Sequence, residues 1–218
     1  MTHDPYLYCI LDLGYVKEAE AERVATALLG GGADLLQLRA KGHSLDLIES
    51  VARRVLPLCR AAGVAFILND HPALAAMLGA DGVHLGQDDG GLAEARDLTG
   101  DGMLIGRSTH SLAQARAALA EGFDYIGFGP LFPTPTKAGR PAIGLGDIAA
   151  MERDVGAHIP AFCIGGIHPG NLAQVLAVGA RRIVMVSALL QAEDIQTATR
   201  AVAAAVAGHW RPQETAEP

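Results

Sequence analysis

The chain has 218 residues, of which 50% are hydrophobic and 19% are charged. This length and apolar content suffice for one domain with a substantial core, or for two small ones. The net charge of −7 provides no broad basic field, which argues against nucleic acid as a partner, so an anionic ligand would need a local cluster of cations.

The cysteines and the N-terminus indicate the cellular compartment in which we expect the protein. Cys9, Cys59 and Cys163 lack metal-ligand spacing, and Cys9 and Cys163 lie in apolar runs where we expect core residues. No disulfide framework is indicated. The N-terminus lacks the pattern of a signal peptide, and no apolar run reaches the roughly 20 residues that span a bilayer. We therefore expect a cytoplasmic protein without a membrane segment.

Eight short apolar runs alternate with Ala- and Leu-rich segments of helical periodicity. The runs span residues 7–13, 34–40, 64–70, 82–87, 103–108, 125–130, 161–167 and 182–187, and the helical segments span 18–32, 44–63, 71–80, 91–98, 111–122, 146–156, 169–180 and 194–208. Ser44, Ser111 and Asn171 are expected N-caps, and several segments end in glycine.

Strict alternation of strand and helix predicts right-handed βαβ units and a parallel sheet. Eight units in a chain of this length favour a single (β/α)8 TIM barrel over an open doubly wound sheet. No shift in composition resembles a linker, so we expect one domain over residues 1–218 with a loosely ordered tail from about residue 211 to 218.

Polar residues gather at the C-terminal ends of the apolar runs. In a (β/α)8 barrel these ends lie on one face, which is where such folds build their sites. The sequence therefore predicts one site assembled from several loops. Its candidate residues are Gln37, Arg39, Lys41, Asn69, Asp70, Gln87, Asp89, Ser108, Thr134 to Lys137, Gly165, Gly166 and Ser187.

The second run ends in "QLRAK". Alternate residues of a strand share a face, so Gln37, Arg39 and Lys41 are expected to point together. Two cations and an amide at a barrel mouth suit a phosphate or diphosphate. The alternative is that Arg39 and Lys41 pair with acidic neighbours at the rim.

Asp70 and Asp89 follow the third and fourth runs and are expected to face each other across neighbouring loops. Two carboxylates that also meet diphosphate oxygens form a natural Mg²⁺ site, and Asn69 is placed to hydrogen-bond a ligand. The alternatives are that Asp70 caps the next helix and that Asp88 and Asp89 form a solvated turn. Asp81 is assigned to a structural turn.

The histidines show no metal-ligand spacing. His84 is expected to be an interior residue with satisfied hydrogen bonds. His110, just past the fifth run, is kept as a candidate acid or base, and His168 is placed on a loop.

Gly165, Gly166 and Ser187 follow the seventh and eighth runs. Glycine lets the backbone approach an anion closely, a helix that begins at Ser187 offers N–H groups to phosphate, and a phosphate site after these strands recurs in this fold. The alternative is that the glycines only form a tight turn. With the cluster around Arg39, this predicts two anionic substrates, or one with anions at both ends.

The loop "FPTPTK" after the sixth run carries Thr134, Thr136 and Lys137. Its prolines restrict the backbone and so limit the entropy lost when the loop becomes ordered. Because it lies between the two predicted anion clusters, we expect it to bridge them.

Together, "QLRAK", "NDHPALAAMLGADGVHLGQDD", "IGRSTHS", "DYIGFGPLFPTPTKAG", "IGGIHPGN" and "VSA" resemble the thiamine-phosphate synthase family in order and spacing. The resemblance runs from about residue 7 to residue 195. It implies a (β/α)8 transferase that joins hydroxymethylpyrimidine diphosphate to a thiazole phosphate, or to its carboxylated form, with Mg²⁺. The products would be thiamine monophosphate and pyrophosphate. His71 stands where the family often has an arginine or a second acid.

Carried over residue by residue, the resemblance implies three sets of contacts. Asp70 and Asp89 would hold Mg²⁺. Gln37, Arg39, Lys41, Asn69, Ser108 and Lys137 would contact the pyrimidine diphosphate, and Arg39, Lys41, Ser108 and Lys137 among them would assist the chemistry. Thr134, Thr136, Gly166, Val186 and Ser187 would contact the thiazole phosphate.

No nucleophile–base pair is evident, which agrees with a mechanism in which pyrophosphate leaves before the thiazole nitrogen attacks. One rival is a thiazole tautomerase of the same fold that would use a histidine such as His110, but it would need neither the carboxylate pair nor the "TPTK" loop. Another is a non-catalytic barrel that binds phosphorylated ligands, which would have lost metal or leaving-group residues. Small-molecule substrates are the expected partners, and a homo-oligomer is left open.

Overall fold

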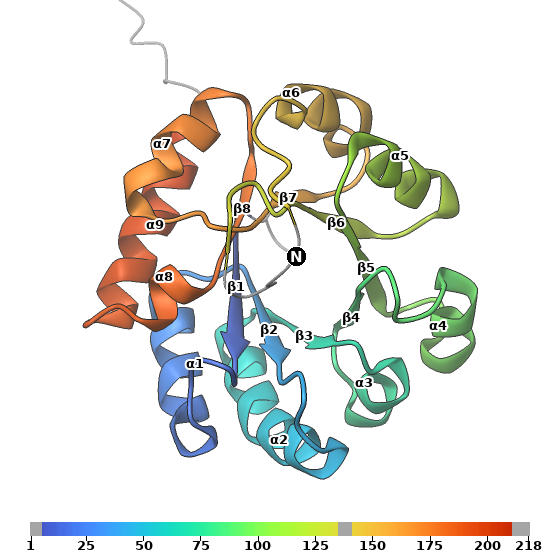
Figure 1. The fold of residues 1–218 in the computed structure, drawn as a ribbon. Coiled ribbons are helices and arrows are strands. Elements are labelled where there is room, and N and C mark those ends of the chain that lie inside the picture. Colours follow the sequence, from blue (N-terminus) through green and yellow to red (C-terminus); the bar gives the residue numbers. More distant parts are fainter. Residues whose placement is uncertain (1–5, 135–140, 211–218) are drawn as a thin grey trace, which may run out of the picture.

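The structure is a computed structural model that describes residues 6–134 and 141–210. Its strands form one closed parallel barrel in chain order, and β8 closes on β1 (Figure 1). The predicted (β/α)8 barrel is confirmed. The strands are β1 (Leu7–Asp12), β2 (Leu35–Arg39), β3 (Ala65–Asn69), β4 (Gly82–Leu85), β5 (Leu104–Thr109), β6 (Tyr125–Phe128), β7 (Ala161–Cys163) and β8 (Arg182–Met185).

Helices surround the barrel and follow the strands in the expected order. The expected helix at 18–32 divides into a 3₁₀ turn and α1, and the one at 146–156 divides into α6 and a π-helical turn. The helices are η1 (Glu18–Glu20), α1 (Ala21–Gly30), α2 (Leu45–Ala62), α3 (Pro72–Leu78), α4 (Leu92–Thr99), α5 (Leu112–Glu121), α6 (Ile148–Met151), η3 (Glu152–Gly156), α7 (Pro169–Ala177), α8 (Ser187–Leu190) and α9 (Ile195–Trp210). The predicted tail lies outside the described residues.

Two of the three predicted N-caps are confirmed. The hydroxyls of Ser44 and Ser111 each accept a hydrogen bond from an amide of the first turn. The prediction for Asn171 was wrong, because Pro169 takes the first helical position of α7 and makes His168 the N-cap. Asn171 Oδ1 instead accepts a hydrogen bond from the His168 amide at 2.8 Å.

Aromatic rings fill the centre of the barrel. Tyr8 on β1 meets Tyr125 on β6 and Phe162 on β7 edge to face, with centroids 6.0 and 5.2 Å apart. Because β1 and β6 are not neighbours in the barrel, these rings meet across its interior. Gly106 on β5 makes room for them, since a Cβ there would lie 2.1 Å from Tyr125 Cζ. We refer to Tyr8, Tyr125 and Phe162 as the aromatic floor.

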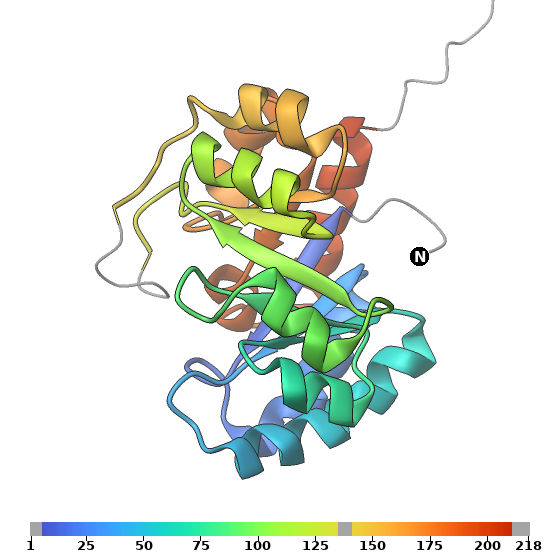
Figure 2. The ribbon, with the colours of Figure 1, turned by 90° about the vertical axis from the view of Figure 1, so that its right-hand side faces the viewer.

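The three cysteines are buried free thiols, as predicted for Cys9 and Cys163. Asp81 has its predicted structural role, because its carboxylate accepts the Phe66 amide at 2.8 Å. Within residues 6–134 and 141–210, no helix combines the length and the apolar character needed to cross a bilayer. The loops that follow β2 and β6 project from the same end of the barrel, and they bring the candidate residues together there (Figure 2).

Candidate active site

A cavity of about 840 Å³, counting the part that opens to solvent, lies at the C-terminal ends of the strands. Residues on or after every strand of the barrel line it. Positions far apart in the sequence therefore meet at one site, as predicted. The predicted site residues on its wall are Gln37, Arg39, Asn69, Ser108, Thr134, Gly165, Gly166, Val186 and Ser187, together with His110. Thr136 and Lys137 lie outside the described residues. The roles of all these side chains stay predictions.

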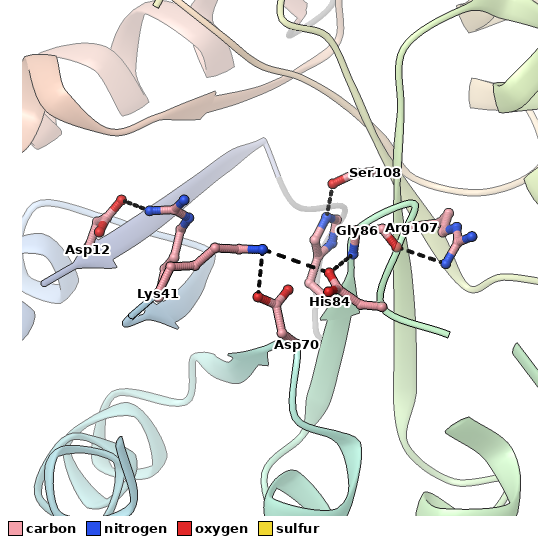
Figure 3. A network of polar contacts seen from close by, with 9 residues as sticks. Asp12, Lys41, Asp70, His84, Gly86, Arg107 and Ser108 are labelled. Atoms are coloured by element: carbon pink, nitrogen blue, oxygen red, sulfur yellow. Dashed lines mark hydrogen bonds and ion pairs between the residues drawn. The ribbon is translucent and has the colours of Figure 1, made fainter. Parts of the chain in front are cut away.

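Beside the cavity, Lys41, Asp70 and Asp89 form a charged group at the rim (Figure 3). Lys41 Nζ lies 2.9 Å from Asp70 Oδ2 and 3.9 Å from Asp89 Oδ2. The two carboxylates therefore approach the same ammonium group, and each influences the pKa of the other. They therefore face each other across neighbouring loops, and Lys41 has the acidic partners that the alternative interpretation required.

The two carboxyl groups have opposite pKa shifts. Burial raises the pKa of Asp70, and the hydrogen bond with Asp89 adds to this against the lowering effect of Lys41. Burial also opposes ionisation of Asp89, but hydrogen bonds with Asp70 and with the Gly86 amide outweigh it and lower the pKa of Asp89. The two carboxyl groups therefore influence each other's pKa, and Asp70 is the weaker acid of the pair.

Asp70 has an unusual backbone conformation and is not the N-cap of the helix that follows it. With φ at 67°, it is the only non-glycine among the described residues in the left-handed region. Its amide donates to the His84 carbonyl at 2.9 Å, which ties it to β4. His71, not Asp70, is the N-cap of α3, and α3 has no side-chain cap. The capping alternative is wrong, and such strain is typical of functional positions.

The loop that carries Asp89 is fixed by hydrogen bonds. Arg107 on β5 donates to the carbonyls of Gly86 at 2.9 Å and Gly90 at 2.7 Å, and Asp89 Oδ2 accepts the Gly86 amide at 2.8 Å. The Asp89 side chain is 24% exposed. The segment is a turn, as the alternative interpretation has it, and Asp88 is exposed in it, whereas Asp89 is half-buried and held by its hydrogen bond with Gly86.

Arg39 also has an acidic partner, and the sequence analysis did not identify it. Its Nη1 lies 2.6 Å from Asp12 Oδ2, and the Asp12 side chain is only 2% exposed. Asp12 Oδ1 accepts the Gly14 amide at 2.9 Å, which fixes the carboxylate. Asp12 ends β1, so the rule that selected polar residues at strand ends, applied to the first run, would have found it.

The cavity wall from the loops after β6, β7 and β8 has no charged side chain among the described residues. Gly165 and Gly166 have φ angles of 100° and 66°, and a Cβ on Gly166 would lie 2.7 Å from the Phe132 Cβ. The Phe132 amide donates to the Gly165 carbonyl at 3.0 Å. The glycines therefore do form the tight turn of the alternative interpretation, and that turn packs the β7 loop on the β6 loop. The same packing leaves Gly166 on the wall of the cavity that Ser187, at the start of α8, also lines.

Two histidines reach the cavity wall. His84 is the satisfied interior residue that was predicted. Its Nδ1 lies 3.2 Å from the Tyr125 hydroxyl. Its Nε2 lies 3.0 Å from Ser108 Oγ, the contact drawn in Figure 3. His110 Nδ1 bonds the Gly129 carbonyl. Because a carbonyl only accepts, Nδ1 carries a proton in this bond. His168, which was placed on a loop, caps α7.

The rim offers few metal ligands of its own. No group of three or more His, Cys, Asp or Glu side chains that could hold a metal gathers in the described part of the chain. Two carboxylates that lie close together repel each other when both are ionised, and a divalent cation bound between them relieves that repulsion. This donor set fits Mg²⁺, which takes one or two carboxylates and completes its shell with phosphate and water.

The barrel, the cavity at its C-terminal mouth and the charged rim define a (β/α)8-barrel enzyme that acts on small molecules. Residues 7–189 match the model of a family described as thiamine monophosphate synthase. The chain belongs to this family, which confirms the resemblance inferred from the motifs.

Individual relatives agree with the family match and make the chain a transferase of thiamine biosynthesis. A thiamine-phosphate synthase from Thermus thermophilus is 48% identical over 189 residues, which cover 87% of this chain and 90% of the relative. One from Bordetella avium is 46% identical over 178 residues, covering 80% and 82%. A solved structure of thiamine phosphate pyrophosphorylase from Pyrococcus furiosus superposes with a TM-score of 0.85 at 30% identity, covering 94% and 97%.

Proposed function

We propose that the chain joins hydroxymethylpyrimidine diphosphate to a thiazole phosphate, or to its carboxylated form, and so acts as a thiamine-phosphate synthase. The observation that carries this proposal is the division of the mouth into two halves. Arg39, Lys41, Asp70 and Asp89 lie on the β2–β4 side, whereas small and neutral residues from the β6–β8 loops line the other. One half suits a diphosphate with its metal, and the other suits a ring with a single phosphate.

In the proposed reaction, the bond between the pyrimidine methylene carbon and the diphosphate oxygen breaks, and both electrons leave with pyrophosphate. The lone pair of the thiazole nitrogen then forms the new C–N bond. With the carboxylated thiazole, CO₂ is also lost. Arg39 and Lys41 stabilise the charge that develops on the leaving group, since cations that are already in place need little reorganisation. Gln37 and Asn69 would orient the pyrimidine diphosphate.

Asp70 and Asp89 would hold Mg²⁺, which when bound neutralises negative charge on the diphosphate. The support is the approach of both carboxylates to Lys41 Nζ and the fixed position of both residues. Ser108 would donate a hydrogen bond to the diphosphate. Lys137 would contact the diphosphate and Thr136 the thiazole phosphate, as the motif predicts.

On the neutral half, Thr134, Gly166, Val186 and Ser187 would bind the thiazole phosphate. Backbone N–H groups beside a glycine and at a helix start are suitable phosphate donors. A non-catalytic barrel would have lost the carboxylate pair or the cations, and the chain has both. We also propose a cytoplasmic location, because three free thiols suit a reducing compartment. Assembly into a homo-oligomer is a separate proposal.

The test is to incubate purified protein with both substrates and Mg²⁺ and to follow thiamine phosphate and pyrophosphate by mass spectrometry. We expect both products in equal amounts, and neither when the thiazole phosphate is omitted or Mg²⁺ is chelated. Folded protein that forms no product from substrates shown to react with another synthase would overturn the proposal.

A further inference from the structure

Five polar side chains form a continuous chain of hydrogen bonds across the base of the cavity. Gln37 Nε2 lies 2.5 Å from the Tyr8 hydroxyl, which lies 3.2 Å from the Tyr125 hydroxyl. The Tyr125 hydroxyl lies 3.2 Å from His84 Nδ1, and His84 Nε2 lies 3.0 Å from Ser108 Oγ. All five side chains are buried. The chain therefore connects two predicted substrate contacts, Gln37 on β2 and Ser108 on β5, across the barrel.

We propose that Tyr8, Tyr125 and His84 are positioning residues, which transmit the orientation of the Gln37 amide to the hydroxyl of Ser108. This rests on the proposed function, because that function gives Gln37 and Ser108 their substrate contacts. The three residues act through hydrogen-bond direction rather than by touching the reacting atoms.

The proposed direction starts at Gln37, whose amide nitrogen donates to the Tyr8 hydroxyl. In this direction Tyr8 turns its own proton toward Tyr125. Tyr125 in turn donates to His84 Nδ1, which places the imidazole proton on Nε2. His84 then donates to Ser108 Oγ, and the Ser108 proton is directed away from His84. That is the orientation in which Ser108 donates to an anionic oxygen.

The opposite direction would change what the site offers. If the Gln37 amide oxygen faced Tyr8, each donor in the chain would become an acceptor, and Ser108 would give its proton to His84. Pyrophosphate would then meet the lone pairs of Ser108, which repel an anion. Burial raises the pKa of both Tyr8 and Tyr125, so the two hydroxyls keep their protons and remain able to relay direction.

The rings that carry these hydroxyls are held independently of them. Tyr8 and Tyr125 pack against each other and against Phe162, and Gly106 leaves the space that the Tyr125 ring occupies. Tyr8→Phe and Tyr125→Phe therefore each remove one hydroxyl, and with it two hydrogen bonds of the chain, and they preserve the packing. Tyr6→Phe is the matched control, because Tyr6 is partly buried just before β1, at the opposite end of the barrel.

The first measurement is the tautomer of His84 by ¹⁵N NMR on the free protein. We expect the proton on Nε2 in the wild type and in Tyr6→Phe, and a shift toward the Nδ1–H tautomer in Tyr125→Phe. A wild type with the proton on Nδ1 would overturn the proposal. This result does not depend on activity, so an inactive wild type would refute the proposed function and leave this test intact.

The second measurement is a double-mutant cycle with Ser108→Ala. Tyr125→Phe and Tyr8→Phe should each lower kcat by about tenfold, the effect of one weakened hydrogen bond, with KM for the pyrimidine diphosphate changed less than kcat. In the Ser108→Ala background the same substitutions should have no further effect on kcat. Equal losses in both backgrounds, or wild-type kcat in both tyrosine variants, would refute the positioning role.

Discussion

The two ends of the barrel use aspartate in different ways. Asp34, Asp81 and Asp124 directly precede β2, β4 and β6, and each accepts hydrogen bonds from backbone amides at the start of a neighbouring strand. Asp12, Asp70 and Asp89 end or follow strands, and each lies beside a cationic side chain. Position within the βα repeat therefore decides the role, because strand starts expose N–H groups that need acceptors and strand ends meet at the cavity.

The largest expected effect is at the mouth. Asp70→Asn keeps the shape of the side chain but removes half of the carboxylate pair, so kcat/KM at saturating Mg²⁺ should fall about 100-fold. Chelation should reduce wild-type activity strongly and change the residual activity of the variant little. Asp101→Asn is the control, because it makes the same change of charge on an exposed residue before β5. It should leave kcat and KM unchanged. Near wild-type kcat/KM in Asp70→Asn would remove Asp70 from the metal site.

At the other end, Asp34→Ala tests an acceptor rather than a charge. Asp34 Oδ2 receives two amides, from Tyr6 at 2.9 Å and Leu7 at 2.8 Å. Both would lose their acceptor, so the free energy of unfolding should fall by about 2 kcal/mol, measured by urea denaturation. The folded variant should retain its kcat. A loss of kcat without a loss of stability would contradict the division between the two ends.

Asp12→Asn should have a moderate effect on activity. Without the carboxylate charge, Arg39 loses the partner that holds it at 2.6 Å, and kcat/KM for the pyrimidine diphosphate should fall about tenfold. Steady-state kinetics with the thiazole phosphate saturating measures this. An increase in kcat/KM would mean that Asp12 competes with the substrate for Arg39 instead of orienting it.

The smallest effect is expected for Asp81→Ala, which removes a single acceptor, that of the Phe66 amide. The free energy of unfolding should fall by about 1 kcal/mol, half of the loss in Asp34→Ala, and kinetic constants should be unchanged. If Asp34→Ala and Asp81→Ala lose equal stability, the number of amides that an aspartate accepts does not determine how much it stabilises the fold.

Much of this arrangement was predictable from the sequence, because it depends on periodicity. The alternation of strand and helix predicted the barrel, and polar residues at strand ends predicted that Arg39, Asn69, Ser108 and Ser187 would share one cavity. Helix ends were less predictable, since Pro169 moved the start of α7 away from Asn171.

The links across the barrel could not be predicted. Tyr8 and Tyr125 are 117 positions apart in the sequence. From an apolar run alone, a tyrosine that only packs in the core cannot be distinguished from one whose hydroxyl joins a hydrogen-bond network. His84 was predicted as satisfied, but its partners depend on which strands face each other across the interior. Only the closed geometry of the barrel decides that.

The aromatic floor has a consequence for attempts to make the protein more thermostable. Tyr8→Phe and Tyr125→Phe are natural choices for a designer, since they keep the rings and remove buried hydroxyls from the core. Because the same hydroxyls are hydrogen-bonded to Gln37 and His84 at the base of the cavity, such repacking would remove a partner from these buried groups and would lower stability and slow turnover together. Stability is better sought on the outer helices, where substitutions leave the centre of the barrel unchanged.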